Sequence, residues 1–231
     1  MVRVPDKPLR DVVAPDLDVL FCGINPSLMS AERGHHFARP GNRFWPALHL
    51  AGLTPRLLRP DEDATLPEFG LGVTNVVARP TRTAAELTAE ELRAGAAELA
   101  ELVARYRPRV LAVLGVTAWR VAFARPRATL GRQPERIGGA ETWVAPNPSG
   151  LNAHHQLPDL ARLYGQLRQP GSATGSSGGG PAEPAGYSSS GTAPAAQAAS
   201  AGSTTRQASS ASSAPTDVAR PPVSTSVSTA Q

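Results

Sequence analysis

The stretch Asp18-Val-Leu-Phe-Cys-Gly-Ile-Asn-Pro-Ser27 joins an uninterrupted apolar run to a polar Asn-Pro step. A short apolar run closed by glycine is typical of a strand buried on both faces of a sheet, and an Asn-Pro step is typical of a turn. Arg109-Val-Leu-Ala-Val-Leu-Gly115 repeats the apolar pattern, and residues 72–77 and 142–145 are shorter versions of it. We therefore predict buried strands at 18–23, 72–77, 109–115 and 142–145.

The segments between these strands carry helical signals. Thr88-Ala-Glu-Glu91 is a capping box, and apolar residues then follow at helical spacing up to Arg107-Pro108, where a helix has to end. Shorter helices are expected at 42–50, 117–123 and 158–167. Strands that alternate with helices favour an α/β fold, here a three-layer α/β/α domain around a small, mostly parallel sheet.

Two of the predicted strands are followed by the same tripeptide. Asn25-Pro-Ser27 follows the first strand, and Asn147-Pro-Ser149 follows the last. In α/β folds of this kind, ligands bind at the carboxyl ends of the strands. We therefore expect both tripeptides to lie at one functional site.

The composition of the chain changes near residue 170. Residues 171–231 contain no Leu, Ile, Phe, Met, Trp or Cys, and their four charged residues are Glu183, Arg206, Asp217 and Arg220. Such a segment buries too little apolar surface to offset an ordering cost of about 1 to 2 kcal/mol per residue. We predict an N-terminal extension at 1–16, a folded domain at 17–169 and a disordered tail at 170–231. The tail serves either as a passive linker or as a contact site for other proteins.

Composition and charge exclude several classes of protein. The chain has 231 residues, with 23 Lys or Arg against 19 Asp or Glu and a net charge of +4. This mild basic excess is compatible with a polyanionic partner but does not identify one. The one cysteine, Cys22, excludes an intramolecular disulfide framework and a zinc site built from several thiolates. Neither a signal peptide nor an apolar window of about 20 residues is visible, so we expect a soluble cytoplasmic protein.

Three segments carry the most distinctive combination of residues. They are Gly23-Ile-Asn-Pro-Ser27, Gly34-His-His-Phe-Ala-Arg-Pro-Gly-Asn-Arg-Phe-Trp45 and Ala145-Pro-Asn-Pro-Ser-Gly-Leu151. Together and in this order, they make the sequence resemble the mismatch-specific uracil/thymine DNA glycosylases of the uracil-DNA glycosylase superfamily. The resemblance extends over residues 17–168 and includes Gly72-Val-Thr-Asn-Val-Val77. It implies that the folded domain is an enzyme that hydrolyses the bond between a base and its deoxyribose in DNA.

The resemblance implies roles for the residues that match the family motifs. Asn25 corresponds to the catalytic Asn, whose amide orients the attacking water but cannot take its proton as a carboxylate would. Backbone N–H groups around Ile24 and Phe37 are the expected donors to the departing base, an arrangement of the oxyanion-hole kind. Phe37 also corresponds to the aromatic that stacks on the extruded base, and Asn75 and Asn147 correspond to base-contacting positions.

Other matching residues are expected to contact the rest of the DNA. Leu151 corresponds to the apolar wedge that fills the gap in the base stack, and Gly150 lets the backbone approach the orphaned guanine. Ser30 and Ser149 are expected to contact phosphates. Arg43 is compatible either with a phosphate contact or with a structural ion pair.

The implied chemistry requires no metal and no cofactor. Schiff-base lyase chemistry needs a lysine, and Lys7 is the only lysine in the chain, so a monofunctional enzyme is expected. We interpret His154 and His155 as solvated loop residues rather than metal ligands, because neither Cys nor a carboxylate stands at ligand spacing. The expected partner is double-stranded DNA with a G·U or related mispair, bound by a monomer on the nucleoid of a bacterial cell, with no membrane contact.

Two departures from the family pattern bear on specificity and on the phosphate contacts expected after the wedge. Ser27 stands where many relatives have glycine, which changes the room beside the base. Asn152-Ala-His154 differs from the small polar and Arg residues that often follow the wedge leucine. A DNA-binding module that recognises a mismatch or lesion without turnover stays open as an alternative. A small-molecule α/β enzyme is less favoured, because no GxGxxG or GxxxxGKS/T phosphate loop follows any strand.

Overall fold

The computed structural model describes residues 9–150 and 152–168. Its sheet is 5-stranded, with the strands in the order β2-β1-β3-β5-β4. The strands are β1 (Val19–Gly23), β2 (Leu71–Asn75), β3 (Val110–Leu114), β4 (Gly131–Ile137) and β5 (Ala140–Ala145). β1, β2, β3 and β5 run parallel, and β4 pairs with β5 in the antiparallel direction. The predicted strands and the mostly parallel sheet are confirmed.

Alternate residues of β1 pack on opposite faces of the sheet. Val19 and Phe21 belong to the apolar cluster on one face, and Leu20 and Cys22 belong to the cluster on the other. All residues of β1, β2 and β3 are buried. Burial on both faces explains why these strands appear in the sequence as continuous apolar runs.

β4 was not predicted from the sequence. Its residues are mostly polar and partly exposed, and its pairing with β5 is irregular between Arg132 and Arg136. Pro134 lies within it, and proline is tolerated in a sheet only at an edge strand or a bulge. The alternating apolar pattern that reveals a half-buried strand is therefore missing.

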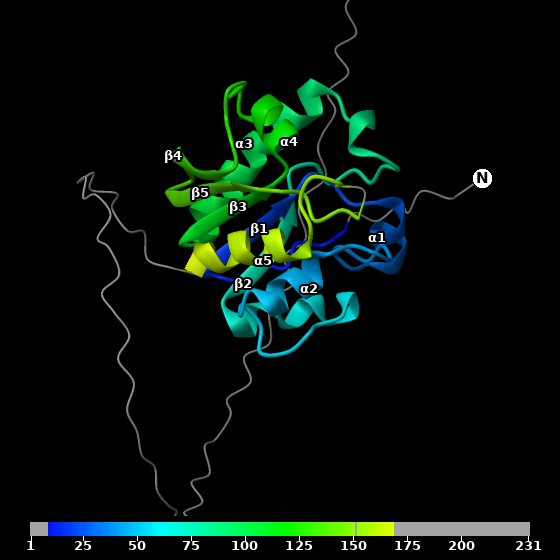
Figure 1. Ribbon diagram of the computed structural model, residues 1–231. Coiled ribbons are helices and arrows are strands. Elements are labelled where there is room, and N and C mark those ends of the chain that lie inside the picture. Colours follow the sequence, from blue (N-terminus) through cyan, green and yellow to red (C-terminus); the bar gives the residue numbers. More distant parts are fainter. Residues whose placement is uncertain (1–8, 151, 169–231) are drawn as a thin grey trace, which may run out of the picture. The chain divides into compact units, whose positions relative to one another are not determined.

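Helices cover both faces of this sheet. They are α1 (Leu28–Arg33), α2 (Phe44–Leu50), α3 (Ala89–Tyr106), α4 (Val116–Ala122) and α5 (Leu157–Gly165), with 3-10 helices η1 (Pro60–Phe69), η2 (Ala84–Glu86) and η3 (Gln166–Arg168). α2, α5 and η1 pack on one face, and α3 and α4 pack on the other (Figure 1). The three-layer arrangement and the four predicted helices are confirmed, whereas the short α1 was not predicted.

Residues that precede β1 pack against the edge of the sheet. Val12 and Val73 exchange backbone hydrogen bonds of 2.9 and 2.8 Å, and the Thr74 hydroxyl donates to the Asp11 carboxylate at 2.6 Å. The predicted extension at 1–16 thus contains residues that cover the outer edge of β2. The predicted tail at 170–231 lies outside the described residues. In the described part of the chain, no helix is both long and apolar enough to cross a membrane.

Candidate active site

The carboxyl ends of the parallel strands surround a cavity of about 360 Å³. The predicted site residues that line it are Ile24, Asn25, Ser30, Phe37, Asn75, Asn147 and Ser149. The structure therefore brings the loops after β1, β2 and β5 together at one site. Gly150 is not part of this lining, and Leu151 lies outside the described residues.

The charge of the cavity lining limits its chemistry. Among the described lining residues there is no Asp, Glu or Lys, and both arginines, Arg39 and Arg82, are exposed. Nor do any three His, Cys, Asp or Glu side chains in the described ranges lie close enough together to hold a metal ion. Exposed arginines suit an anionic polymer such as DNA. With no carboxylate in the described lining, a reaction in this cavity has no carboxylate base and depends more on the placement of groups.

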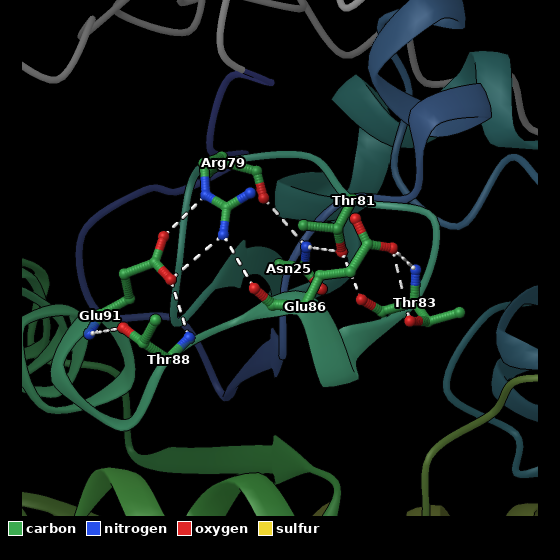
Figure 2. Close-up of polar contacts among 7 residues, drawn as sticks. All are labelled: Asn25, Arg79, Thr81, Thr83, Glu86, Thr88 and Glu91. Atoms are coloured by element: carbon green, nitrogen blue, oxygen red, sulfur yellow. Dashed lines mark hydrogen bonds and ion pairs between the residues drawn. The ribbon is translucent and has the colours of Figure 1, made fainter.

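The Asn25 amide is held in one orientation (Figure 2). Its Nδ2 donates to the backbone carbonyl of Arg79 at 2.9 Å and to the Thr81 hydroxyl at 2.7 Å. A carbonyl oxygen can only accept, so Nδ2 rather than Oδ1 must face Arg79. The Thr81 hydroxyl donates its own hydrogen to the Thr83 carbonyl at 2.8 Å, so it must accept from Asn25.

Both Nδ2 hydrogens of Asn25 are therefore used, and Oδ1 is the amide atom left for a ligand in the cavity. No described residue donates a hydrogen bond to this oxygen. An amide oxygen can accept a hydrogen bond from a water molecule and orient its lone pairs without removing a proton. The geometry of Asn25 thus suits the positioning of a water molecule.

Arg79 and Thr81 were not predicted as site residues. They follow β2 at the same edge of the sheet at which the Asn-Pro-Ser tripeptides follow β1 and β5. Their position after the carboxyl end of a parallel strand was the signal available in the sequence.

Phe37 occupies a strained position beside the cavity. Its φ of 53° lies in the left-handed region, which residues other than glycine rarely adopt and which often marks functional sites. Its ring stacks on Phe44, with centroids 4.0 Å and planes 27° apart. Phe44 is buried in the core, so the core supports one face of the Phe37 ring while Phe37 also lines the cavity. This arrangement suits stacking on a flat ligand.

A neutral histidine orients the Asn75 side chain. The Nε2 of His36 lies 2.8 Å from the Arg10 carbonyl, so the hydrogen of the neutral ring is on Nε2 and Nδ1 is an acceptor. Nδ1 lies 3.5 Å from the Nδ2 of Asn75, which places the amide nitrogen toward His36. Burial is the largest influence on the pKa of His36 and lowers it below 6.5, although Asp63 and Asp11 act in the opposite direction. His36 was missed because burial of a single His is invisible in the sequence.

We expect the burial of neutral His36 to destabilise the protein at acidic pH. Below pH 6.5 the unfolded chain takes up a proton that the folded protein resists, so this stability is complete above pH 6.5 and falls below it. The loss is at most about 1.4 kcal/mol for each pH unit. Urea unfolding at about pH 7.5 and about pH 5.5 measures the loss.

The His36→Gln variant is expected to lose less stability between these two pH values than the wild type. His154→Gln, at an exposed position, should behave as the wild type does. If the free energy of unfolding falls by the same amount between these two pH values in His36→Gln and in the wild type, His36 is not the group responsible for the loss of stability.

The remaining predicted residues shape the loops around the cavity. Ser27 caps α1, because its Oγ accepts from the Ser30 N–H at 3.1 Å. The buried Ser30 hydroxyl accepts from the Ser27 hydroxyl at 3.0 Å and from the Ala38 N–H at 3.1 Å, so it is engaged within the protein. The Asn147 Oδ1 accepts from the Ser149 N–H at 2.9 Å and tightens the turn after β5.

Arg43 holds the loop that follows β5. Its guanidinium donates to the backbone carbonyls of Ser149, Asn152 and His155, the last two at 2.9 and 2.7 Å. Its backbone N–H donates to the Pro148 carbonyl at 2.9 Å. In the sequence, Ser149 precedes the predicted wedge Leu151, and Asn152 and His155 follow it. Within the described residues no carboxylate pairs with Arg43, so the ion pair considered from the sequence is not formed there.

From the DNA glycosylase activity that the sequence resemblance implies, we expect Arg43→Lys to weaken binding to DNA that contains an abasic site. A single ammonium group cannot reach all of the carbonyls that a planar guanidinium spans, so the loop should lose its fixed shape. The expected increase in Kd is about 10-fold, equivalent to about 1.4 kcal/mol, with a smaller change in the single-turnover rate. Fluorescence anisotropy with an abasic duplex measures the Kd, and Arg105→Lys, at an exposed position on α3, is the control. A larger effect on the rate than on the Kd would contradict this role.

The fold and the site agree with one known family. A model of the uracil DNA glycosylase superfamily matches residues 10–168 and so includes the whole sheet and the loops that carry Asn25, Phe37, Asn75 and Asn147. The match also includes residues 10–16, which lie within the predicted extension. Members of this superfamily are DNA glycosylases, hydrolases that release uracil from DNA. The chain therefore belongs to the uracil DNA glycosylase superfamily.

Proposed function

We propose that the protein is a monofunctional, monomeric DNA glycosylase that excises uracil or a related lesion from mispairs with guanine and so initiates base excision repair. The observation that carries this proposal is the fixed Asn25 amide in a cavity whose described lining has no carboxylate. An amide cannot remove a proton from water, so the chemical step receives little help from acid–base catalysis. Such an enzyme depends on a base that leaves the helix at a low free-energy cost, and mispaired bases meet that condition.

In the proposed reaction, the target nucleotide turns out of the duplex and its base lies against Phe37. The Oδ1 of Asn25 accepts a hydrogen bond from a water molecule and directs a lone pair of the water to the anomeric carbon. The bond between this carbon and the base nitrogen breaks, positive charge builds on the sugar, and the electron pair leaves with the base. Backbone N–H groups near Ile24 and Phe37 stabilise the departing anion, and the proton of the water passes to solvent.

Asn75 is proposed to recognise the base. Because its Nδ2 is turned toward His36, it offers the cavity Oδ1 as an acceptor and the second Nδ2 hydrogen as a donor. Uracil and thymine present an N3–H donor beside carbonyl acceptors, which is the complementary pattern. Gly23 provides the room for this amide, since a Cβ at Gly23 would lie 2.5 Å from the Oδ1 of Asn75.

Gly150 and Leu151 are proposed to enter the DNA where the nucleotide has left. Gly150 also allows close packing of two loops, because a Cβ there would lie 2.8 Å from the Gly41 carbonyl. Leu151 is beyond the described residues, and its proposed role as a wedge rests on the family resemblance. Arg43 donates to the backbone carbonyls of Ser149 and Asn152, the described residues that stand two positions before and one position after Leu151 in the sequence.

Single-turnover cleavage by the full chain, with EDTA present, tests the proposed specificity. The substrates are duplexes with G·U, A·U, G·T and G·ethenocytosine, together with single-stranded uracil DNA. Excision from G·U well above A·U and single strands would support mismatch specificity, and equal excision from G·U and A·U would contradict it. Absence of excision with retained mismatch binding would favour a recognition module instead.

A further inference from the structure

Arg79 connects the Asn25 amide to a helix outside the cavity. Its backbone carbonyl accepts the hydrogen bond from Asn25, and its guanidinium points away toward the start of α3 (Figure 2). There, Nε donates to one carboxylate oxygen of Glu91 at 2.6 Å, and Nη2 donates to the other at 3.1 Å. Nη2 also donates to the Glu86 carbonyl at 3.1 Å. This two-point pairing restricts the direction of the guanidinium.

Glu91 is itself rigidly held. Its Oε2 accepts from the Thr88 N–H at 2.8 Å, and its own N–H donates to the Thr88 hydroxyl at 3.1 Å, which is the capping box of α3. The hydrogen bonds from Arg79 and from the Thr88 backbone lower the pKa of Glu91 to about 2, so the carboxylate stays charged at neutral pH. The guanidinium of Arg79 is therefore anchored to the first turn of the longest helix in the described residues.

The second acceptor of the Asn25 amide is anchored through the same loop. Thr81 donates to the Thr83 carbonyl at 2.8 Å, and the Thr83 N–H donates to the Glu86 carboxylate at 2.9 Å. Pro80 stands between the two acceptors, and its ring restricts the backbone that joins them. Both atoms that orient Asn25 thus belong to one loop, at 79–86. Hydrogen bonds to the carboxylates of Glu86 and Glu91 hold this loop in place.

The ion pair between Arg79 and Glu91 is too exposed to contribute much to the stability of the folded protein. The two side chains are 49% and 31% exposed, and pairs with this exposure contribute little to the free energy of unfolding. The position of a reacting group, in contrast, affects the rate strongly, because a displacement of about 1 Å can cost 100-fold. A large effect on the rate without a comparable effect on stability therefore distinguishes positioning from packing.

We propose that Arg79 and Glu91 are positioning residues, which fix the direction of the Asn25 amide by holding the Arg79 carbonyl from outside the cavity. The proposal rests on the proposed catalytic role of Asn25. The new element of the proposal is that the charge of Glu91, at the start of α3, affects the rate of the chemical step.

Arg79→Ala and Glu91→Gln test this proposal against Arg125→Ala. Arg125 pairs with Glu135 at 49% and 29% exposure, which closely matches the Arg79 pair, but Glu135 lies on β4, at the opposite end of the sheet from β2. We expect the single-turnover rate on saturating G·U duplex to fall about 10-fold in Arg79→Ala and in Glu91→Gln. Arg125→Ala should keep the wild-type rate, and all three variants should keep Kd for DNA within about 2-fold. An unchanged rate in Arg79→Ala would overturn the proposal.

Combination with Asn25→Ala shows whether Arg79 acts through Asn25. The variant with both substitutions should be no slower than Asn25→Ala alone, because an amide that is absent cannot be misplaced. If Arg79→Ala slows the reaction equally in both backgrounds, Arg79 acts independently of Asn25, for example on a phosphate, and the proposal is wrong. Glu91→Gln gives a second check, since it leaves the positive charge of Arg79 free for DNA.

A spectroscopic measurement separates this proposal from the proposed function. The side-chain amide signals of Asn25, identified by their loss in Asn25→Ala, should shift in the ¹H–¹⁵N spectrum of Glu91→Gln and stay in place in Arg125→Ala. If the wild type excises no base but these signals shift, the proposed function fails while the structural coupling stands. If the signals do not move in Glu91→Gln and Arg79→Ala, the coupling itself is absent.

Discussion

Asn25→Ala is expected to reduce the single-turnover rate of excision from G·U duplex by about 100-fold or more, while binding to mismatched DNA remains. The substitution removes the amide oxygen that is proposed to orient the attacking water molecule. Groups that orient or stabilise reacting atoms contribute factors of about 10² to 10⁴ to the rate. The described lining contains no carboxylate that could take over the role of the Asn25 amide. Rates at saturating enzyme and an anisotropy titration separate the chemical step from binding.

Asn25→Asp tests whether the direction of the amide, rather than its basicity, is important. A carboxylate is a stronger base, but it cannot donate to the Arg79 carbonyl or to Thr81, and it would meet two acceptors. We therefore expect Asn25→Asp to be slower than the wild type. A faster Asn25→Asp enzyme would show that proton removal limits the rate. An Asn25→Ala variant with wild-type turnover would remove Asn25 from the mechanism.

Gly95→Ala is expected to destabilise the folded protein by about 3 kcal/mol, at the upper end of the range for overpacked cores. A Cβ on Gly95 would lie 2.1 Å from the carbonyl oxygen of Val76, and a backbone atom cannot swing away as a side chain does. Helix propensity alone predicts the opposite sign, since alanine is favoured over glycine in a helix by about 1 kcal/mol. The steric effect is the larger, so α3 has to move away from the sheet.

Gly165→Ala on α5 is the matched control for this prediction. Its Cβ would lie 3.6 Å from the nearest heavy atom, the Ala51 carbonyl oxygen, which is an ordinary contact. We expect this variant to be as stable as the wild type or more stable by up to about 1 kcal/mol. Urea unfolding of both variants measures the difference. Equal stability of Gly95→Ala and the wild type would mean that the packing of α3 on Val76 is not tight.

The elements with strong local signals were the ones predicted correctly. β1 and β3 are continuous apolar runs because they are buried on both faces, and α3 begins at the predicted capping box of Thr88 and Glu91. β4 and α1 were missed, because a polar edge strand lacks apolar alternation and a six-residue helix is too short to show a period.

The sequence also indicated where the site lies but not how it is organised. Motifs at the ends of β1 and β5 led to the loops that line the cavity. The direction of the Asn25 amide depends on Arg79 and Thr81, which are 54 and 56 positions away. Neither residue belongs to a motif that we recognised.

Sequence by itself therefore determined the α/β class, the main strands and helices, and the group of loops in which the site lies, because periodicity, capping and turn chemistry depend on neighbouring residues. Only the tertiary structure decided that Asn25 presents its Oδ1 to the cavity and that His36 is neutral. It also decided that Arg43 holds the carbonyl of Ser149, which is 106 positions away in the sequence. These properties depend on burial and on hydrogen bonds between distant segments, and both arise only when the chain is folded.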